Sequence, residues 1–125
     1  MSVELNHTIV FACDRRVSAT FLADLLDLEV GAPWGPFLPV ELSNGVRLDF
    51  VTSDREIALQ HYAFLIPEEA FDAFFERLRA SGTEYFADPA CQQPGEINHN
   101  HGGRGVYFLD PAGHGLEVIT QPYDS

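Results

Sequence analysis

The chain has 125 residues, of which 46% are hydrophobic, enough for one domain or for two small modules that share a core. Its 19 acidic and 7 basic residues give a formal net charge of −12. That charge argues against binding to nucleic acid or to an anionic membrane surface, because both need clustered Lys and Arg. No apolar run reaches the roughly 18 residues of a membrane span. No secretory signal pattern opens the chain, so we expect a cytoplasmic protein.

The first half of the chain predicts a strand, a helix, a short strand and a hairpin. In the first strand the two-residue period places His7, Ile9 and Phe11 on one face. Asp14 stands where the N-cap of the helix is expected. Asn44-Gly45 is a strong hairpin signal between two apolar runs. These elements are expected at residues 4–12, 15–27, 28–30 and 39–52.

The second half repeats this order after a polar stretch at 53–57. A helix is expected to begin at Pro67, because proline suits a first helical turn, and to stop at Gly82. A loop rich in Pro, Gly, Asn and His follows, at about 87–103, and such long loops are often binding loops. The strands are expected at 59–66, 84–86, 104–109 and 115–121.

This internal repetition sets the predicted fold. His7 and His61 each open a strand that precedes a helix. Asp49 and Glu117 each lie in a last strand of the pattern Leu-acid-apolar-apolar-Thr. We therefore expect an α+β fold in a single domain, 1–125, built from two βαβββ modules, about 4–52 and about 59–121, whose mixed sheets form a cup.

Glu117 is a charge within the apolar, β-branched run 116–120, where a carboxylate needs a partner or a bound cation. Two histidines and two carboxylates on related strands suggest a metal centre. Imidazole and carboxylate ligands suit Fe, Mn, Ni or Zn without choosing among them. Asp49 is either a fourth ligand, a general base beside the metal, or neither.

The duplicated pattern, His-Tyr-Ala-Phe at 61–64 and the stretch from Val106 to Glu117, which reads VYFLDPAGHGLE, resemble the vicinal oxygen chelate (VOC) superfamily. This family includes glyoxalase I, extradiol dioxygenases, fosfomycin-resistance thiol transferases and bleomycin-binding proteins. The resemblance covers nearly the whole chain and implies a cupped glyoxalase/bleomycin-resistance/dioxygenase fold. It also implies a homodimer, in some members with modules exchanged between chains.

The resemblance implies the ligands by position. The family takes metal ligands from the first strand of each module and from the last strand of the second, which match His7, His61 and Glu117. In the glyoxalase I branch, the last strand of the first module adds a fourth ligand, which matches Asp49, although that branch uses the longer glutamate.

Each closer activity departs from this sequence in some respect. Fosfomycin-resistance enzymes share the 61–64 motif and a tyrosine ten residues before the last ligand, here Tyr107, which makes Tyr107 a candidate catalytic group with Asp49. They carry threonine where this chain has Ile9, and the 95–105 stretch lacks their serine- and lysine-bearing loop. Glyoxalase I needs glutathione-binding arginines, of which this chain has few.

Candidate substrate-binding residues come from the loop and from isolated aromatic side chains. They are Arg104, His101, Trp34 and Tyr62. Arg104 could instead pair with one of the many surface acids, and the aromatic residues could instead belong to the core. The lead hypothesis is a divalent-metal-dependent enzyme, a lyase, isomerase or dioxygenase, that acts on a small oxygen-chelating substrate. The alternative is a non-catalytic protein that binds a drug or another small molecule, as bleomycin-resistance proteins do.

Overall fold

The computed structural model describes residues 1–123. The chain divides into two compact units, a first module from Met1 to Ala58 and a second module that begins at Leu59. This division falls between the two predicted repeats.

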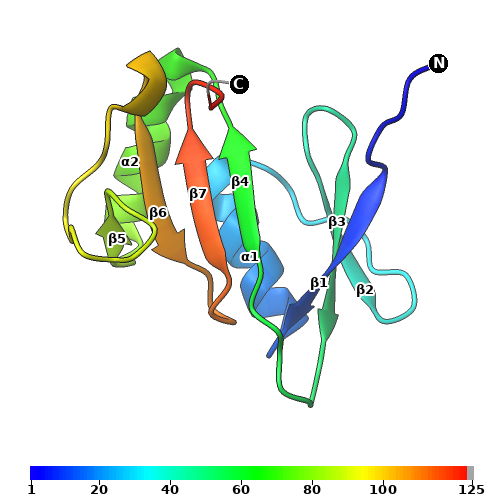
Figure 1. The fold of residues 1–125 in the computed structure, drawn as a ribbon. Helices are drawn as coiled ribbons and strands as arrows, with labels where there is room; N and C mark the ends of the chain where they lie inside the picture. Colours follow the sequence, from blue (N-terminus) through cyan, green and yellow to red (C-terminus); the bar gives the residue numbers. More distant parts are fainter. Residues whose placement is uncertain (124–125) are drawn as a thin grey trace. The chain divides into compact units, whose positions relative to one another are not determined.

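The first module is a three-stranded mixed sheet with one helix against it (Figure 1). The sheet order is β1-β3-β2, with β1 parallel and β2 antiparallel to β3. Asp14 caps the helix as predicted, because its side chain accepts hydrogen bonds from the amides of Arg16 and Val17. The predicted strand at 28–30 is reduced to a single bridge between Val30 and Val40. The elements are β1 (His7–Ala12), α1 (Arg15–Leu26), β2 (Phe37–Glu41) and β3 (Arg47–Thr52).

The second module repeats this plan with a fourth strand. Its sheet order is β4-β7-β6-β5, with β4 parallel to β7 and the other pairs antiparallel. The helix begins as a 3₁₀ turn after Pro67, as the proline predicts. The elements are β4 (His61–Leu65), η1 (Glu68–Ala70), α2 (Phe71–Ala80), β5 (Tyr85–Phe86), η2 (Asn100–Gly102), β6 (Gly105–Leu109) and β7 (Gly115–Ile119). Two mixed sheets with two helices confirm the predicted α+β class.

The two modules place their histidine and acid in the same register. In the first, Ile9 lies opposite Asp49 across the parallel β1–β3 pair, two residues after His7. In the second, Ala63 lies opposite Glu117 across β4–β7, two residues after His61. Since side chains alternate along a strand, each histidine shares a sheet face with its module's acid.

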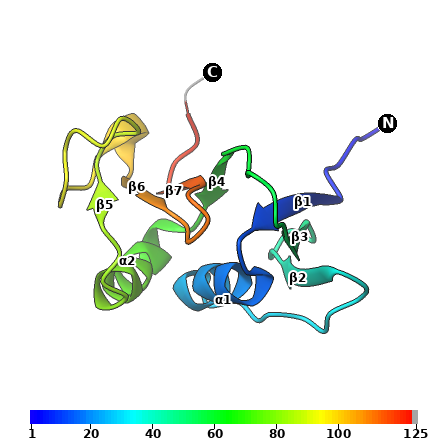
Figure 2. The ribbon, with the colours of Figure 1, turned by 90° about the horizontal axis from the view of Figure 1, so that it is seen from below.

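The opposite face of each sheet carries the core. Val10, Leu48 and Phe50 of the first sheet are buried on the side of α1. In the second, Phe74 of α2 packs against Phe108 of β6 with ring centroids 6.1 Å apart. Figure 2 shows one helix along each module's sheet. In each module the helix therefore covers the sheet face opposite the one that carries the histidine.

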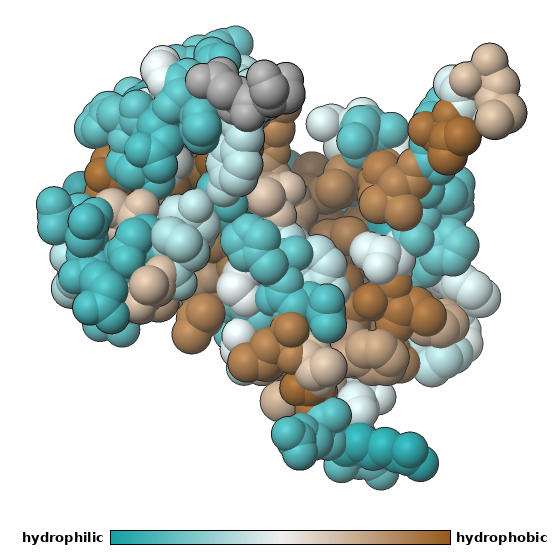
Figure 3. Space-filling model, viewed as in Figure 1, coloured by the Kyte–Doolittle hydropathy of each residue, from teal (hydrophilic) through white to brown (hydrophobic). Residues whose placement is uncertain are grey.

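The surface differs between these regions. Hydrophilic residues cover the side of the 87–103 loop and β5, at the left of Figure 3, while hydrophobic residues gather over β1. Ile9 and Phe11 of β1 are 42% and 49% exposed. Within residues 1–123, no helix has both the length and the apolar character needed to cross a bilayer.

Candidate metal centre

Glu117 is a buried carboxylate at the middle of β7, with only 1% of its surface exposed. It lies opposite Ala63 of β4 on one side and Tyr107 of β6 on the other. Its Oε1 is 3.0 Å from Nε2 of His61. The pairing of β4, β7 and β6 thus brings together two predicted metal ligands, His61 and Glu117, and the predicted catalytic residue Tyr107.

The partners of Glu117 are an imidazole and a phenol. The hydroxyl of Tyr123 donates to Glu117 Oε1 and Oε2 at 2.8 and 2.6 Å. No arginine hydrogen-bonds to Glu117 within the residues that the structure describes. Because a buried carboxylate is costly without a cation beside it, this donor set of carboxylate and imidazole fits a divalent metal ion.

Two tyrosines surround this carboxylate. The Tyr107 hydroxyl lies 3.2 Å from that of Tyr123. Burial, followed by the hydrogen bond with Tyr123, raises the pKa of Tyr107 well above its usual range. The hydrogen bond to Glu117 is the main cause that raises the pKa of Tyr123. Both phenols therefore stay protonated at neutral pH and act as hydrogen-bond donors.

Tyr123 was not predicted, because it lies beyond the last strand and has no counterpart in the first module. Its ring also lies 5.0 Å from the ring of His101. The predicted substrate-binding residue His101 is thus placed next to the Glu117 cluster. His101 has a left-handed backbone, with φ of 57°, a strained conformation for a residue other than glycine and one that occurs often at functional sites.

The first module holds its acid differently. Asp49 is also buried, at 1% exposure, but Arg47 binds it with both prongs of the guanidinium, Nε to Oδ1 at 2.7 Å and Nη2 to Oδ2 at 3.1 Å. This hydrogen bond raises the pKa of Arg47. Alternation along β3 puts Arg47 and Asp49 on one face, so their contact could have been predicted from the sequence.

His7 and Trp34 complete the first module's candidates. His7 is exposed, and its Nδ1 lies 2.8 Å from Oδ1 of Asn6, which leaves Nε2 as the nitrogen available to a metal. Trp34 packs against Phe37 with centroids 5.1 Å apart, and the Arg47 guanidinium lies 5.8 Å from its ring. Trp34 therefore lies beside the Arg47–Asp49 pair.

Neither module holds a complete metal site alone. Within the described part of each module, no three His, Cys, Asp or Glu side chains cluster closely enough to hold a metal. The second module brings His61 and Glu117 together, and the first presents His7. The three-ligand set therefore stays a prediction that draws on both modules.

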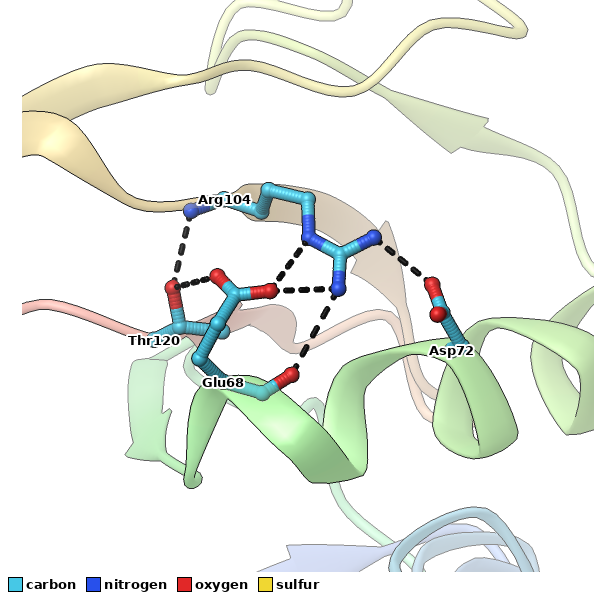
Figure 4. Close-up of polar contacts among 4 residues, drawn as sticks. All are labelled: Glu68, Asp72, Arg104 and Thr120. Carbon is cyan, nitrogen blue, oxygen red and sulfur yellow. Dashed lines mark hydrogen bonds and ion pairs between the residues drawn. The ribbon is translucent and has the colours of Figure 1, made fainter.

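Arg104 is engaged in a structural cluster (Figure 4). Its guanidinium binds Glu68 and Asp72, with 2.7 Å from Nη1 to the Asp72 carboxylate, and lies 4.4 Å from the centroid of the Phe71 ring. Its backbone amide donates to Oγ1 of Thr120 at 2.8 Å. The predicted role in substrate binding stays a prediction, and this guanidinium already serves two carboxylates.

Tyr62 points to the opposite face of β4 from His61, as neighbouring strand residues must. Its ring meets His114 edge-on at a centroid distance of 5.7 Å. Burial raises the pKa of Tyr62, and the negative charge of Asp110 adds to that rise. His114 is buried at 1% exposure, and its Nδ1 accepts a hydrogen bond from the amide of Gln60 at 3.0 Å. The structure thus separates Tyr62 from the Glu117 cluster.

Comparison with known proteins agrees with this fold. No family model matches the chain. The glutathione transferase FosA of Serratia marcescens is 34% identical over 94% of this chain and 81% of its own length. The chain belongs to the vicinal oxygen chelate superfamily, the class of small metalloenzymes and binding proteins that share this duplicated fold.

Two solved structures are also similar to the chain. The oxidase ChaP-H2 is 58% identical, covers 100% of this chain and 98% of its own, and superimposes with a TM-score of 0.97. The E126Q mutant of the fosfomycin-resistance protein FosX from Listeria monocytogenes, complexed with Mn(II) and a dihydroxypropylphosphonic acid, has a TM-score of 0.75 at 21% identity, over 98% of this chain and 95% of its own. The FosX comparison supports the fold alone.

Proposed function

We propose that this protein is a divalent-metal-dependent oxidase that acts on a small substrate with two adjacent oxygen atoms. His7, His61 and Glu117 are the proposed metal ligands. The observation that carries the proposal is the Glu117 carboxylate, buried at 1% exposure in β7, next to His61 and without an arginine partner among the described residues. A divalent cation would compensate that charge.

Oxidation is favoured over the other reactions of the superfamily. The oxidase ChaP-H2 is similar over the full length of the chain at 58% identity. Two histidines and one carboxylate with open coordination positions are typical of Fe(II) oxygenases. Arg47 holds both oxygens of Asp49, which supports a three-ligand set over a four-ligand set of the glyoxalase I type.

When bound, the metal would supply a Lewis acid that polarises the two substrate oxygens and, as iron or manganese, a redox partner for oxygen. The chain's own residues would hold the metal and orient the substrate. Glu117 and His61 are fixed on adjacent parallel strands, where Glu117 pairs with Ala63, two residues after His61. Tyr107 projects from β6 beside Glu117 and keeps its proton, so its proposed role is to donate a hydrogen bond to a negatively charged substrate oxygen.

Fosfomycin modification is the second candidate, because FosA is 34% identical. That chemistry must bind a phosphonate dianion, which calls for cationic side chains. All seven basic residues of this chain are arginines. Arg47 and Arg104 are already bound to carboxylates. The engaged arginines and the net charge of −12 favour the oxidase.

A homodimer and a cytoplasmic location are also proposed. The half-exposed Ile9 and Phe11 on the histidine face of β1 support self-association, because burial of such residues favours an interface. Light scattering on the purified protein should give twice the 13.9 kDa mass of the chain. A mass of one chain at micromolar concentration would contradict the dimer.

The function is tested by oxygen consumption. Protein reloaded anaerobically with Fe(II) or Mn(II) is mixed with catechols and related vicinal diols, and dissolved oxygen is recorded. We expect substrate-dependent uptake that is lost in Glu117→Gln and His61→Ala. Turnover of fosfomycin with glutathione and no oxygen uptake would support the transferase instead. Tight binding of a substrate without turnover or metal would support a non-catalytic binding protein.

A further inference from the structure

We propose that Tyr123 is a built-in competitor of the metal at Glu117. Its hydroxyl hydrogen-bonds to both oxygens of the carboxylate and must release them when a metal binds. This inference rests on the proposed function, because it assumes that Glu117 is a metal ligand. It assigns a role to a residue outside both repeats.

The position of the Tyr123 hydroxyl carries the proposal. It lies 2.8 Å from Oε1 and 2.6 Å from Oε2 of Glu117, so it straddles the open end of the carboxylate. The remaining neighbour, Nε2 of His61, lies 3.0 Å from Oε1. A metal that binds Glu117 needs a lone pair of a carboxylate oxygen. The Tyr123 hydroxyl and His61 Nε2 now approach these lone pairs.

The neighbours of Tyr123 hold it in this position. The Tyr107 hydroxyl is 3.2 Å away, and since the proton of Tyr123 goes to Glu117, Tyr107 is the donor of that pair. The ring of Tyr123 lies beside that of His101. The Glu117 carboxylate is therefore stabilised by a chain of two phenols.

The segment 121–123, which carries Tyr123, follows directly after Thr120, whose side chain is held by hydrogen bonds. Thr120 is fixed, because its Oγ1 accepts from the Arg104 amide at 2.8 Å and donates to Glu68 Oε1 at 3.0 Å. Only Gln121 and Pro122 separate it from Tyr123, and both are exposed. Release of Tyr123 from Glu117 therefore needs rotation of a short exposed segment and leaves β7 intact.

The affinity for metal should report this competition. A hydrogen bond to a charged group is stronger than a neutral one, and its loss on metal binding weakens apparent affinity on the order of tenfold. Zn(II) dissociation constants are measured against a chelator for wild type, Tyr123→Phe and Tyr85→Phe. Tyr85 packs against Phe75 with centroids 5.1 Å apart and has no contact with Glu117, so it is the matched control.

We expect Tyr123→Phe to bind Zn(II) about tenfold more tightly, with Tyr85→Phe equal to wild type. Equal or weaker binding by Tyr123→Phe would overturn the proposal, and weaker binding would identify Tyr123 as a residue that supports the ligand. If wild type binds no Zn(II), Fe(II) or Mn(II), the proposed function fails together with this inference. If wild type binds and the variant is unchanged, only this inference fails.

A second measurement follows Tyr123 in the wild-type protein. The chain has four tyrosines, so protein labelled with 3-fluorotyrosine should give four fluorine resonances. The Tyr123→Phe spectrum identifies the resonance of Tyr123. On addition of Zn(II) that resonance should move toward the position of free fluorotyrosine while that of Tyr85 stays unchanged. A Tyr123 resonance that is unaffected at saturating Zn(II) would contradict release from Glu117.

Discussion

The two acids of the internal repeat, Asp49 and Glu117, occupy equivalent positions but have different hydrogen-bond partners. Asp49 and Glu117 each lie in the last strand of a module, opposite the residue two after a histidine. Arg47 binds Asp49 with two hydrogen bonds, whereas Glu117 hydrogen-bonds to His61 and Tyr123 and has no arginine partner among the described residues. The repeat has thus kept the carboxylate in both modules but has given an arginine partner only to Asp49 among the described residues.

This difference predicts the effect of removing Arg47. Arg47→Met should lower the melting temperature, because Asp49 would remain as a buried charge without its partner. The double variant Arg47→Met/Asp49→Asn should recover part of that loss, since a neutral amide is less costly to bury. Thermal unfolding at pH 7 measures both. A double variant no more stable than Arg47→Met would contradict this account of the pair.

At the scale of the elements, Arg104 joins the start of the second helix to the sheet. It begins the segment that leads into β6, binds Glu68 of η1 and Asp72 of α2, and shares Thr120 with Glu68. The same cluster closes the 87–103 loop and fixes the end of β7 near the Tyr123 tail. The cluster therefore holds Thr120 in place, three residues before Tyr123, and no hydrogen bond joins Arg104 to Glu117 among the described residues.

The cluster predicts a pH dependence of stability. The hydrogen bond from Arg104, followed by that from Thr120, lowers the pKa of Glu68 below its usual 4.5. A lowered folded-state pKa stabilises the fold above pH 4.5, and this stabilisation is lost as the pH falls through the folded-state pKa. Urea unfolding should show Glu68→Gln less stable than wild type at pH 7, with the difference smaller near pH 3.

The neighbouring Glu69→Gln is the matched control for this measurement. It removes one negative charge from the same turn but leaves the Arg104 hydrogen bonds intact. The stability difference between wild type and Glu69→Gln should change less with pH than that of Glu68→Gln. Equal pH dependence of both variants would assign the effect to general surface charge.

A glycine beside this cluster allows the close approach of the loop and β7. A Cβ atom on Gly103 would lie 2.5 Å from Oγ1 of Thr120 and 2.7 Å from Cγ of Gln121. Gly103→Ala should therefore destabilise the protein by about 1 to 3 kcal/mol, as overpacking commonly does. Chemical denaturation measures this cost.

Gly115→Ala is the control for that glycine. A Cβ atom there would meet its nearest neighbour, Nδ1 of His61, at 3.5 Å, which is an ordinary contact distance. We expect its unfolding free energy to stay within about 0.5 kcal/mol of wild type in the absence of metal. If the two variants lose equal stability, general loss of glycine flexibility, and not the contact with Thr120, explains the effect.

At the scale of the whole molecule, periodicity and repetition predicted the elements well. The alternation at His7, Ile9 and Phe11, the Asp14 cap and the Asn44-Gly45 hairpin all have their expected structures. These features depend on neighbours in sequence or on the two-residue period. The duplicated register of histidine and acid followed from the repeat as well.

Contacts that bring distant segments together were not predictable in the same way. Tyr123 follows the last strand, in a segment without periodicity, so no pattern placed it on Glu117. The sequence leaves open whether Arg104 holds an anionic substrate group or pairs with a surface acid, because its partners Glu68 and Asp72 come from a segment far away in sequence. By contrast, strand alternation alone could have paired Arg47 with Asp49 and moved Tyr62 away from His61.

Manganese binding tests the central claim, that Glu117 and the two histidines hold a metal while Asp49 does not. Free Mn(II) is titrated by electron paramagnetic resonance against wild type and the variants Glu117→Gln, His61→Ala, His7→Ala and Asp49→Asn. We predict one tight site per chain in wild type and Asp49→Asn, and its loss in the other three. Unchanged binding in Glu117→Gln, or loss of the site in Asp49→Asn, would contradict this account.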